Sequence, residues 1–213
     1  MKLAVVGRGR WGGVYGRTLE KLGIDYEIGR TWRGCDGVIV ASPPETHYEL
    51  AREILTAGYP LVLEKPITTD PSQAWELVKL GGIAFAGHTR LYSPSWRKFK
   101  ASLSTVESVD CVVGGTARDP WWDWGPHLVA MCLDLGFDPR KARIACMSAS
   151  VPLSFRVNGD REWRDAITDP MPLEVLINEF VAAIERGEPD NDGLKLGARV
   201  VEFLNEPRGL HIG

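Results

Sequence analysis

The chain has 213 residues, of which 44% are hydrophobic and 25% charged, as is typical of a globular protein with one large domain or two small ones. Its net charge of −3 gives no electrostatic basis for binding nucleic acid or an anionic membrane. No apolar run approaches the ~20 residues that a transmembrane helix needs. The four cysteines are widely spaced and form no C-x-x-C pair, which favours buried thiols over a disulfide framework or a metal site. We therefore expect a cytoplasmic protein that has no signal peptide and binds no metal.

The first residues have the pattern of a nucleotide-binding loop. Leu3–Val6 is a short apolar run that predicts a buried strand, and Val14–Leu22 predicts a helix. Between them the glycines are spaced as G-x-G-x-x-G, which permits a tight turn, close approach of a pyrophosphate and close packing of the helix. The alternative interpretation of this spacing is a glycine-rich turn that binds no nucleotide, in an ordinary α/β domain. The loop residues that we expect to bind a cofactor are Gly7, Gly9, Arg10, Trp11 and Gly12.

The end of the second predicted strand, residues 24–28, should determine which dinucleotide binds. An acidic residue about 20 positions after the loop would hold a ribose 2′-hydroxyl, whereas a basic one would hold a 2′-phosphate. Glu27 lies near that distance, but the strand-end position favours Arg30 and Thr31, which offer a cation and a hydroxyl. We therefore expect NADP in preference to NAD, with a solvated surface arginine as the alternative interpretation of Arg30.

Short apolar strands then alternate with helices, which predicts a parallel sheet with ligands at the carboxyl ends of its strands. The expected strands are residues 36–42, 61–63 and 83–86, and the expected helices are residues 46–58 and 71–80. The residues that follow these strands are candidates for the site. Besides Arg30 and Thr31, the cofactor-binding candidates are Ser42, Pro43, His47, Glu64 and Lys65.

The order of motifs resembles the Gfo/Idh/MocA oxidoreductases. The matching stretches are GRGRWG at 7–12, DGVIVASPPETH at 36–47, LVLEKPITTD at 61–70, GHTRLYSPSWRKFK at 87–100, DWGPH at 123–127 and the C-terminal LEVLINEFVAAIERGEP…DGLKLGARVVEFL. The resemblance implies an α/β protein with a Rossmann-type parallel sheet, followed by a small α/β domain with an open, mostly antiparallel sheet used for oligomerisation. We place the dinucleotide-binding domain at 1–88 and the substrate-binding domain at 89–213, with the C-terminal helix able to pack back on the first domain.

One segment departs from the family pattern. Family members usually have a helix, a strand and another helix between the second strand and the strand at 36–42. Here only residues 31–35 separate Arg30 from Asp36, which is short for a parallel crossover. Either the sheet lacks a strand or the connection is direct, and the adenosine side of the cofactor site depends on the outcome.

The second domain is predicted to combine strands with apolar helices. The expected strands are residues 106–116, 143–151 and 153–157, with a hairpin turn at 158–160, and the expected helices are residues 128–135, 174–185 and 194–204.

Hydride transfer by a nicotinamide requires the protein to orient the substrate and to handle one proton. Lys65 follows a strand, and Asp123 lies one helical turn before His127. In the family, the lysine of E-K-P and the D-x-x-x-H pair carry substrate binding and proton transfer, so the resemblance implies these roles for Lys65, Asp123 and His127, and a cis peptide before Pro66. The alternatives are a simple Lys-Pro turn and a buried structural histidine.

The substrate candidates are His88, Arg90 and Trp124. Trp121, Trp122 and Trp124 could stack on a sugar, fill a core or line an interface, and the sequence does not separate these roles. We expect an NAD(P)-dependent oxidoreductase acting on a sugar, a cyclitol or a sugar derivative, assembled as a homodimer or higher homo-oligomer through the open sheet. The alternatives are a reductase of a tetrapyrrole or an imine, and a non-catalytic NADP-binding sensor.

Overall fold

The computed structural model describes residues 1–165 and 170–207 and divides the chain into two compact units. The first unit contains residues 1–87 and 173–201, and the second contains residues 88–172 and 202–213. The chain therefore leaves the first unit after its sheet is complete and returns to it for the C-terminal helices. Residues 173–201, which the sequence grouped with the second domain, are grouped by their contacts with the first unit.

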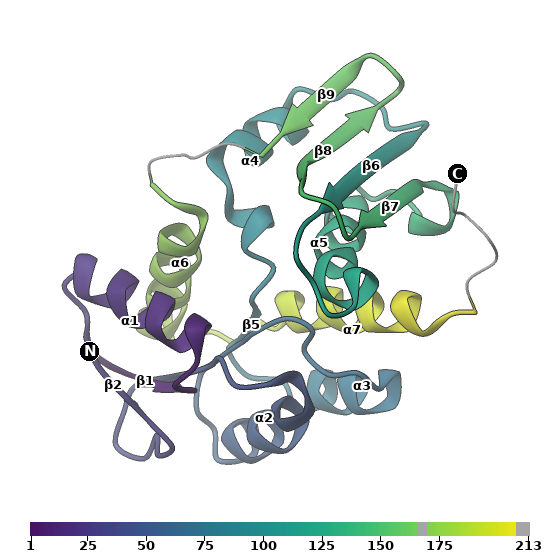
Figure 1. The fold of residues 1–213 in the computed structure, drawn as a ribbon. Coiled ribbons are helices and arrows are strands. Elements are labelled where there is room, and N and C mark those ends of the chain that lie inside the picture. The colour runs from purple at the N-terminus through teal and green to yellow at the C-terminus, as the bar shows by residue number, and fades with distance from the viewer. Residues whose placement is uncertain (166–169, 208–213) are drawn as a thin grey trace. The chain divides into compact units, whose positions relative to one another are not determined.

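The first unit is built on a five-stranded parallel sheet in the order β2-β1-β3-β4-β5 (Figure 1). Its strands are β1 Lys2–Val6, β2 Asp25–Gly29, β3 Gly37–Val40, β4 Leu61–Leu63 and β5 Ala84–Ala86. Its helices are α1 Arg10–Lys21, α2 His47–Thr56, α3 Pro71–Leu80, α6 Pro172–Arg186 and the first part of α7 Asp192–Asn205, with a 3-10 turn, η1, at Pro44–Thr46. This confirms the predicted Rossmann-type sheet, and α1 begins at Arg10, earlier than the periodicity indicated.

Both faces of this sheet are buried. Alternate side chains of each strand point to opposite sides, and helices cover the sheet on both sides. One in-register row, Ala4, Val38, Leu61 and Ala84, packs against α2, α3 and α7. The opposite face contacts α6, where the rings of Phe85 and Phe180 meet edge to face at 5.6 Å. Helices α2 and α3 lie side by side in Figure 1. The continuous apolar runs of the sequence are thus explained by a sheet that is covered on both sides.

The connection from β2 to β3 is direct, and the described residues contain no strand beyond β2. Residues 30–36 cross the end of β1 without a helix. An extended segment of this length reaches roughly 25 Å, whereas the path requires about 15 Å along the strands and about 10 Å across them. Trp32 and Cys35 of this segment are buried in the core beside α2. Both possibilities raised by the sequence therefore hold together: a strand is missing and the crossover is direct.

The second unit has a four-stranded sheet in the order β7-β6-β8-β9, in which β6 and β7 are parallel and the other pairs antiparallel. Its strands are β6 Val109–Gly114, β7 Arg143–Met147, β8 Val151–Val157 and β9 Arg161–Arg164. Its helices are α4 Pro94–Ala101 and α5 Pro120–Asp134, with 3-10 turns η2 Thr89–Tyr92 and η3 Pro139–Lys141. The predicted hairpin is confirmed: Asn158 and Gly159 both have positive φ, at 54° and 81°, as a type I′ turn requires.

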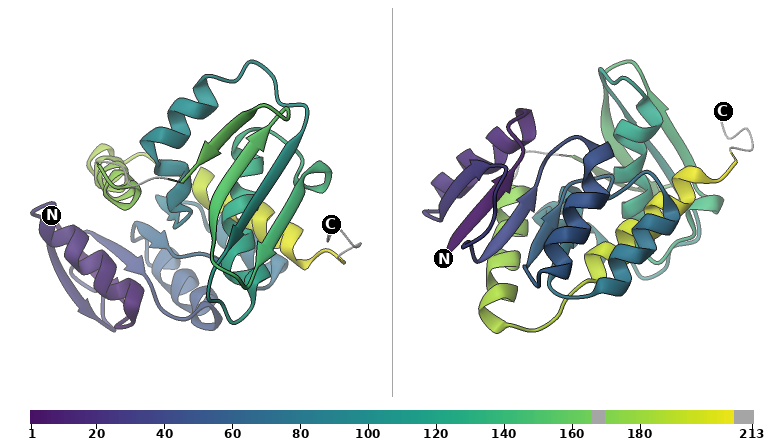
Figure 2. Two further views of the ribbon diagram at one scale, coloured as in Figure 1. Left: turned by 45° about the horizontal axis from the view of Figure 1, so that its top comes forward. Right: turned by 90° about the horizontal axis from the view of Figure 1, so that it is seen from below.

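Helices α4 and α5 cover one face of this second sheet, as the left view in Figure 2 shows. Trp96 is fully buried there and meets Phe155 and Trp163 edge to face. The other face carries ion pairs between neighbouring strands, including one between Arg143 and Asp110. This is the open sheet that the family resemblance implied.

The helix start predicted at residue 128 is wrong. Helix α5 begins at Pro120, because Asp119 accepts hydrogen bonds from the N–H groups of Trp121 and Trp122 at 2.9 and 3.3 Å. Helix α4 was not predicted, although Ser93 followed by Pro94 is the same kind of start signal.

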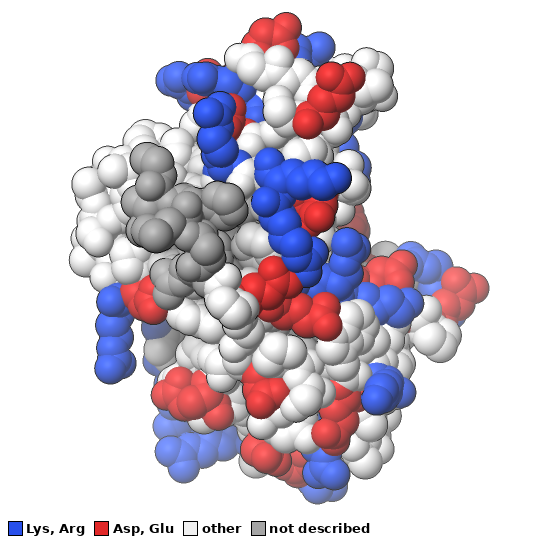
Figure 3. All heavy atoms as spheres, turned by 90° about the vertical axis from the view of Figure 1, so that its right-hand side faces the viewer, with Lys and Arg blue, Asp and Glu red and all other residues white. Residues whose placement is uncertain are grey.

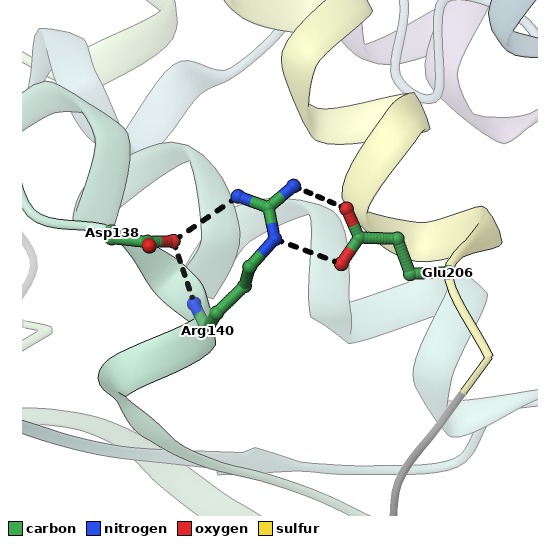
Figure 4. Close-up of polar contacts among 3 residues, drawn as sticks. All are labelled: Asp138, Arg140 and Glu206. Carbon is green, nitrogen blue, oxygen red and sulfur yellow. Dashed lines mark hydrogen bonds and ion pairs between the residues drawn. The ribbon is translucent and has the colours of Figure 1, made fainter.

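The end of α7 is held within the second unit by charged groups (Figure 4). Arg140 of η3 binds both carboxylate oxygens of Glu206, with Nε and Oε2 3.1 Å apart, and Asp138 accepts from Arg140 as well. Among the described residues on the face drawn in Figure 3, basic and acidic side chains are interspersed.

The burial of Trp32 predicts that the direct crossover is fixed by packing. Trp32→Ala should lower the free energy of unfolding by about 3–5 kcal/mol, since it leaves a large cavity. Trp11→Ala, at a side chain 43% exposed, is the matched control and should change it by less than about 0.5 kcal/mol. Urea unfolding followed by circular dichroism measures both. Equal effects of the two substitutions would contradict the packing role.

Candidate cofactor and substrate site

The glycine loop between β1 and α1 fits only glycine at two positions. Gly7 has φ +139°, and a Cβ there would lie 2.4 Å from the carbonyl oxygen of Ala41. A Cβ on Gly12 would lie 1.9 Å from the carbonyl oxygen of Gly7. Neither approach is possible for another residue, so these glycines let α1 start against the ends of β1 and β3. Around Gly9, in contrast, a Cβ would meet nothing within 4 Å.

The first turn of α1 is suited to an anion. Gly9 is its N-cap and provides no side-chain hydrogen bond, and the first turn has no acidic residue. The N–H groups at a helix N-terminus carry partial positive charge and bind phosphates when no side chain caps them. Arg8, Arg10 and Trp11 are exposed around this turn. The loop can therefore hold a pyrophosphate on its backbone, with exposed basic side chains nearby.

The end of β2 carries the residues expected to contact the adenosine ribose. Arg30 and Thr31 are both exposed after the strand. Glu27, the acidic alternative, is engaged instead by Lys2, whose Nζ lies 2.7 Å from its Oε2. This lysine lowers the pKa of Glu27, first through the hydrogen bond and then through its charge. Arg30 is thus the charged side chain that remains at the strand end.

Two further strand ends are connected by His47. The ring of His47 is buried, with Nε2 2.8 Å from the carbonyl oxygen of Ser42 and Nδ1 2.7 Å from that of Pro66. Burial lowers the pKa of His47, and the two carbonyl groups oppose that shift. Exposed Pro43 and the hydroxyl of Ser42 lie at the start of this loop. His47 therefore acts as a connector between the loop after β3 and the loop after β4 and is not an exposed ligand.

Lys65 lies in the loop after β4, and its peptide bond to Pro66 is cis, as the family resemblance implied. The neighbouring Glu64 is buried and accepts a hydrogen bond from the Tyr15 hydroxyl at 2.7 Å. Burial raises the pKa of the Glu64 carboxyl, whereas Tyr15 and Lys65 lower it. Glu64 is inside the protein, so its predicted contact with a cofactor stays a hypothesis, and the link to Tyr15 was not predicted.

In the second unit, Asp123 and His127 lie one turn apart on α5. The Oδ2 atom of Asp123 accepts hydrogen bonds from the N–H groups of Arg118 and Asp119, at 3.0 and 3.3 Å. This oxygen therefore stabilises the start of the helix, a structural role that the sequence analysis did not assign to it. His127 is buried, with 8% of its surface exposed.

Another charged pair of the second unit was missed by the sequence analysis. Arg90, in η2, forms an ion pair with Asp165 at 2.7 Å. Burial raises the pKa of Asp165, and the charge of Arg90 opposes that shift. His88 is buried just before η2. The half-buried Trp124 ring lies so close to Gly115 that a Cβ on Gly115 would be 2.9 Å from the ring. Asp165 carried no motif or spacing signal that could have identified it.

The candidates thus form two sets. In the first unit, the glycine loop, Ser42, His47 and Lys65 lie at the carboxyl ends of β1, β3 and β4, with Arg30 at the edge strand. In the second unit, η2 contacts α5, so the segment with Arg90 neighbours the helix that bears Asp123 and His127.

Within residues 1–165 and 170–207, no cluster of three or more His, Cys, Asp or Glu side chains is arranged to bind a metal. The helices in the same residues are all too short or too polar to cross a bilayer.

Comparison with known proteins agrees with this geometry. The family model for GFO_IDH_MocA, described as an oxidoreductase family with an NAD-binding Rossmann fold, matches residues 26–81. Inositol 2-dehydrogenase 1 of Saccharopolyspora erythraea is 36% identical over 85 residues, which cover 38% of this chain and 25% of the relative. Over residues 26–81 the chain is thus similar to the Gfo/Idh/MocA oxidoreductases.

Solved structures extend the likeness in fold to both units. A putative oxidoreductase from Magnetospirillum magnetotacticum has a TM-score of 0.79 at 24% identity, covering 96% of this chain and 98% of that one. GenD2 from gentamicin A biosynthesis, solved with NAD, has a TM-score of 0.74 at 17% identity, covering 96% and 92%. At these identities the structures show a likeness in fold alone. The curated relative above, in contrast, is matched over only a quarter of its length.

The contacts of the glycine loop predict opposite outcomes for two substitutions that both add one methyl group. Gly12→Ala should lower the midpoint of thermal unfolding by several degrees, because the Gly7 carbonyl must move. Gly9→Ala should leave that midpoint unchanged, because its Cβ enters open space. Differential scanning calorimetry of the two variants measures this. A destabilised Gly9→Ala variant beside an unaffected Gly12→Ala variant would refute the described loop.

Proposed function

We propose that the protein is an NAD(P)-dependent oxidoreductase that transfers a hydride between a nicotinamide and a hydroxyl or carbonyl group of a sugar, a cyclitol or a sugar derivative. The observation that carries this proposal is the uncapped N-terminus of α1 behind a loop that only Gly7 and Gly12 can form. The family-model match over residues 26–81 and the inositol 2-dehydrogenase relative support the redox class and the polyhydroxylated substrate.

The residues of the first unit fit such a cofactor. The backbone around Gly9 and Arg10 would hold the pyrophosphate, and the loops after β3 and β4 would border the nicotinamide, with Ser42 and Pro43 on one and Lys65 on the other. When bound, the nicotinamide supplies or accepts the hydride. The protein must then move one proton, because oxidation of an alcohol needs a base and reduction of a carbonyl needs an acid.

Lys65 is our first candidate for the proton transfer, and His127 is the second. Lys65 is half-buried, beside a carboxyl group and in a loop whose direction is fixed by Pro66 and His47. Asp123 would orient His127 or a substrate hydroxyl through the part of its carboxylate that does not hold the helix start. His88, Arg90 and Trp124 would contact the substrate.

A second candidate function is a non-catalytic NADP-binding sensor. Two structural contacts favour it: Oδ2 of Asp123 holds the start of α5, and Arg90 is paired with Asp165. A sensor would bind the cofactor without needing Lys65, so turnover separates the two functions. A reductase of an imine or a tetrapyrrole would retain turnover but require a different substrate panel.

We further propose that the protein forms a homodimer or higher homo-oligomer through the open face of the second sheet and works in the cytoplasm. The face without helices carries ion pairs between β6 and β7 and between β8 and β9, so its partner surface would be polar. Cys35, Cys111, Cys132 and Cys146 are all free thiols, which fits a reducing compartment.

Substitution of Lys65 tests the proposed reaction. Lys65→Ala should lower kcat about 100-fold or more while the cofactor Kd changes less than twofold, because general acid–base catalysis contributes 10²–10⁴-fold. Lys79→Ala, at an exposed lysine of α3, is the control and should leave both constants unchanged. Nicotinamide absorbance with a panel of sugars, cyclitols and sugar derivatives gives kcat, and calorimetry gives Kd. Absence of cofactor binding by the wild type would overturn the proposal, and binding without turnover would favour the sensor.

Substitution of Arg30 tests the preference for NADP. Arg30→Ala should raise the Kd of NADPH about tenfold and leave that of NADH unchanged, because only NADPH has a 2′-phosphate for the guanidinium to bind. The control is Arg33→Ala, since Arg33 is exposed in the same connection and lies 4.0 Å from Glu53. Calorimetric titration with each nucleotide measures the ratio. Equal changes for the two nucleotides would show that Arg30 does not recognise the 2′-phosphate.

A further inference from the structure

The structure contains a buried polar link between α1 and the loop that bears Lys65. Tyr15 lies in α1 and is 0% exposed, and its hydroxyl donates to Oε1 of Glu64 at 2.7 Å. Glu64 follows β4 and is 4% exposed. Its second oxygen, Oε2, accepts a hydrogen bond from the backbone N–H of Lys65 at 3.1 Å. One carboxyl group thus joins a helix near the glycine loop to the residue proposed to move the proton.

The protein makes room for this carboxyl group at a position occupied by glycine. A Cβ on Gly87, which follows β5, would lie 2.8 Å from Oε1 of Glu64 and 3.1 Å from its Cα. Any larger residue would therefore displace Glu64. The carboxyl group is enclosed by α1, by its own loop and by the end of β5, so its direction is fixed from three sides.

Such burial is unfavourable for a carboxyl group unless a function or a set of partners offsets it. Burial alone raises the pKa of Glu64, while Tyr15, the charge of Lys65 and the Lys65 N–H lower it, in that order. The same attraction acts in the other direction, because a carboxylate stabilises a nearby ammonium group. A core leucine would fill the volume without the desolvation cost, yet it would provide neither the acceptor for Lys65 N–H nor the charge.

We propose that Tyr15 and Glu64 are positioning residues for Lys65: the Tyr15 hydroxyl fixes the Glu64 carboxyl group, which in turn fixes the Lys65 backbone and acts by its charge on the Lys65 side chain. This deepens the proposed function and rests on it for the role of Lys65 in proton transfer. Neither residue touches the reacting atoms. Both adjust the geometry and protonation of the group that does.

Two substitutions separate this role from simple packing. Tyr15→Phe removes only the hydroxyl, and Glu64→Gln keeps the shape but has one acceptor oxygen for two donors. Tyr59→Phe is the matched control, because it also removes one tyrosine hydroxyl. Tyr59 lies just before β4 and packs against the core cluster that contains Leu61 and Leu63. Each variant is first compared with the wild type by thermal unfolding, so that loss of folding is recognised.

The first readout needs no cofactor and no substrate. Lysine side chains of the protein are reductively methylated with ¹³C and titrated by NMR, and Lys65→Ala identifies the Lys65 signal. We expect the Lys65 signal to titrate at a lower pH in Glu64→Gln than in the wild type, because the stabilising carboxylate is lost. Tyr15→Phe should shift it in the same direction by a smaller amount, and Tyr59→Phe should not shift it. An unchanged Lys65 titration in folded Glu64→Gln would overturn the proposal.

The second readout is the division between kcat and KM. Tyr15→Phe should lower kcat about tenfold with the cofactor KM unchanged within twofold, and the pH at which kcat is half-maximal should move with the Lys65 titration. A folded Tyr15→Phe variant with wild-type kcat and an unshifted pH profile would also overturn the proposal. If the wild type shows no turnover at all, the proposed function fails, while the titration of Lys65 still decides the link to Glu64.

Discussion

The first unit depends on one close approach: Gly12 lies against the carbonyl group of Gly7, where a Cβ would be 1.9 Å from the oxygen. Because glycine has no side chain to block this approach, α1 can begin directly at the ends of β1 and β3. Its first N–H groups then lie beyond the sheet. The same placement brings Tyr15, on the next turn of α1, to Glu64 after β4. The proposed phosphate site and the proposed setting of Lys65 thus follow from one packing constraint.

Much of this arrangement could be predicted because its signals are local. The spacing of Gly7, Gly9 and Gly12 identified the loop, and the apolar runs predicted the parallel strands, since a strand covered on both faces has no polar alternation. Helix starts were predicted less completely. Asp119 followed by Pro120 and Ser93 followed by Pro94 are cap signals of the same kind as Asp70 with Pro71, yet the tryptophans and basic residues after them concealed the helical periodicity.

The parts that could not be predicted depend on contacts between distant segments. Nothing in the sequence near Glu64 indicates that Tyr15 donates to it or that Gly87 makes room for it. The pairing of Arg90 with Asp165 is equally non-local. Asp123 shows a different limit: its spacing from His127 predicted a catalytic pair, whereas its Oδ2 atom also holds the N–H groups at the start of its own helix. A motif gives the residue type and spacing, but not which other partners a side chain has.

The direct crossover and the missing strand make the cofactor question specific to this chain. Since the connection from β2 to β3 is direct and no strand lies beyond β2 in the described residues, we propose that Arg30 and Thr31 contact the adenosine end of a dinucleotide. A crystal structure of the protein with NADPH tests the account most directly. We predict pyrophosphate oxygens within hydrogen-bond distance of the N–H groups at the start of α1, and the nicotinamide beside Lys65. A nucleotide bound elsewhere, or no nucleotide at saturating concentration, would contradict it.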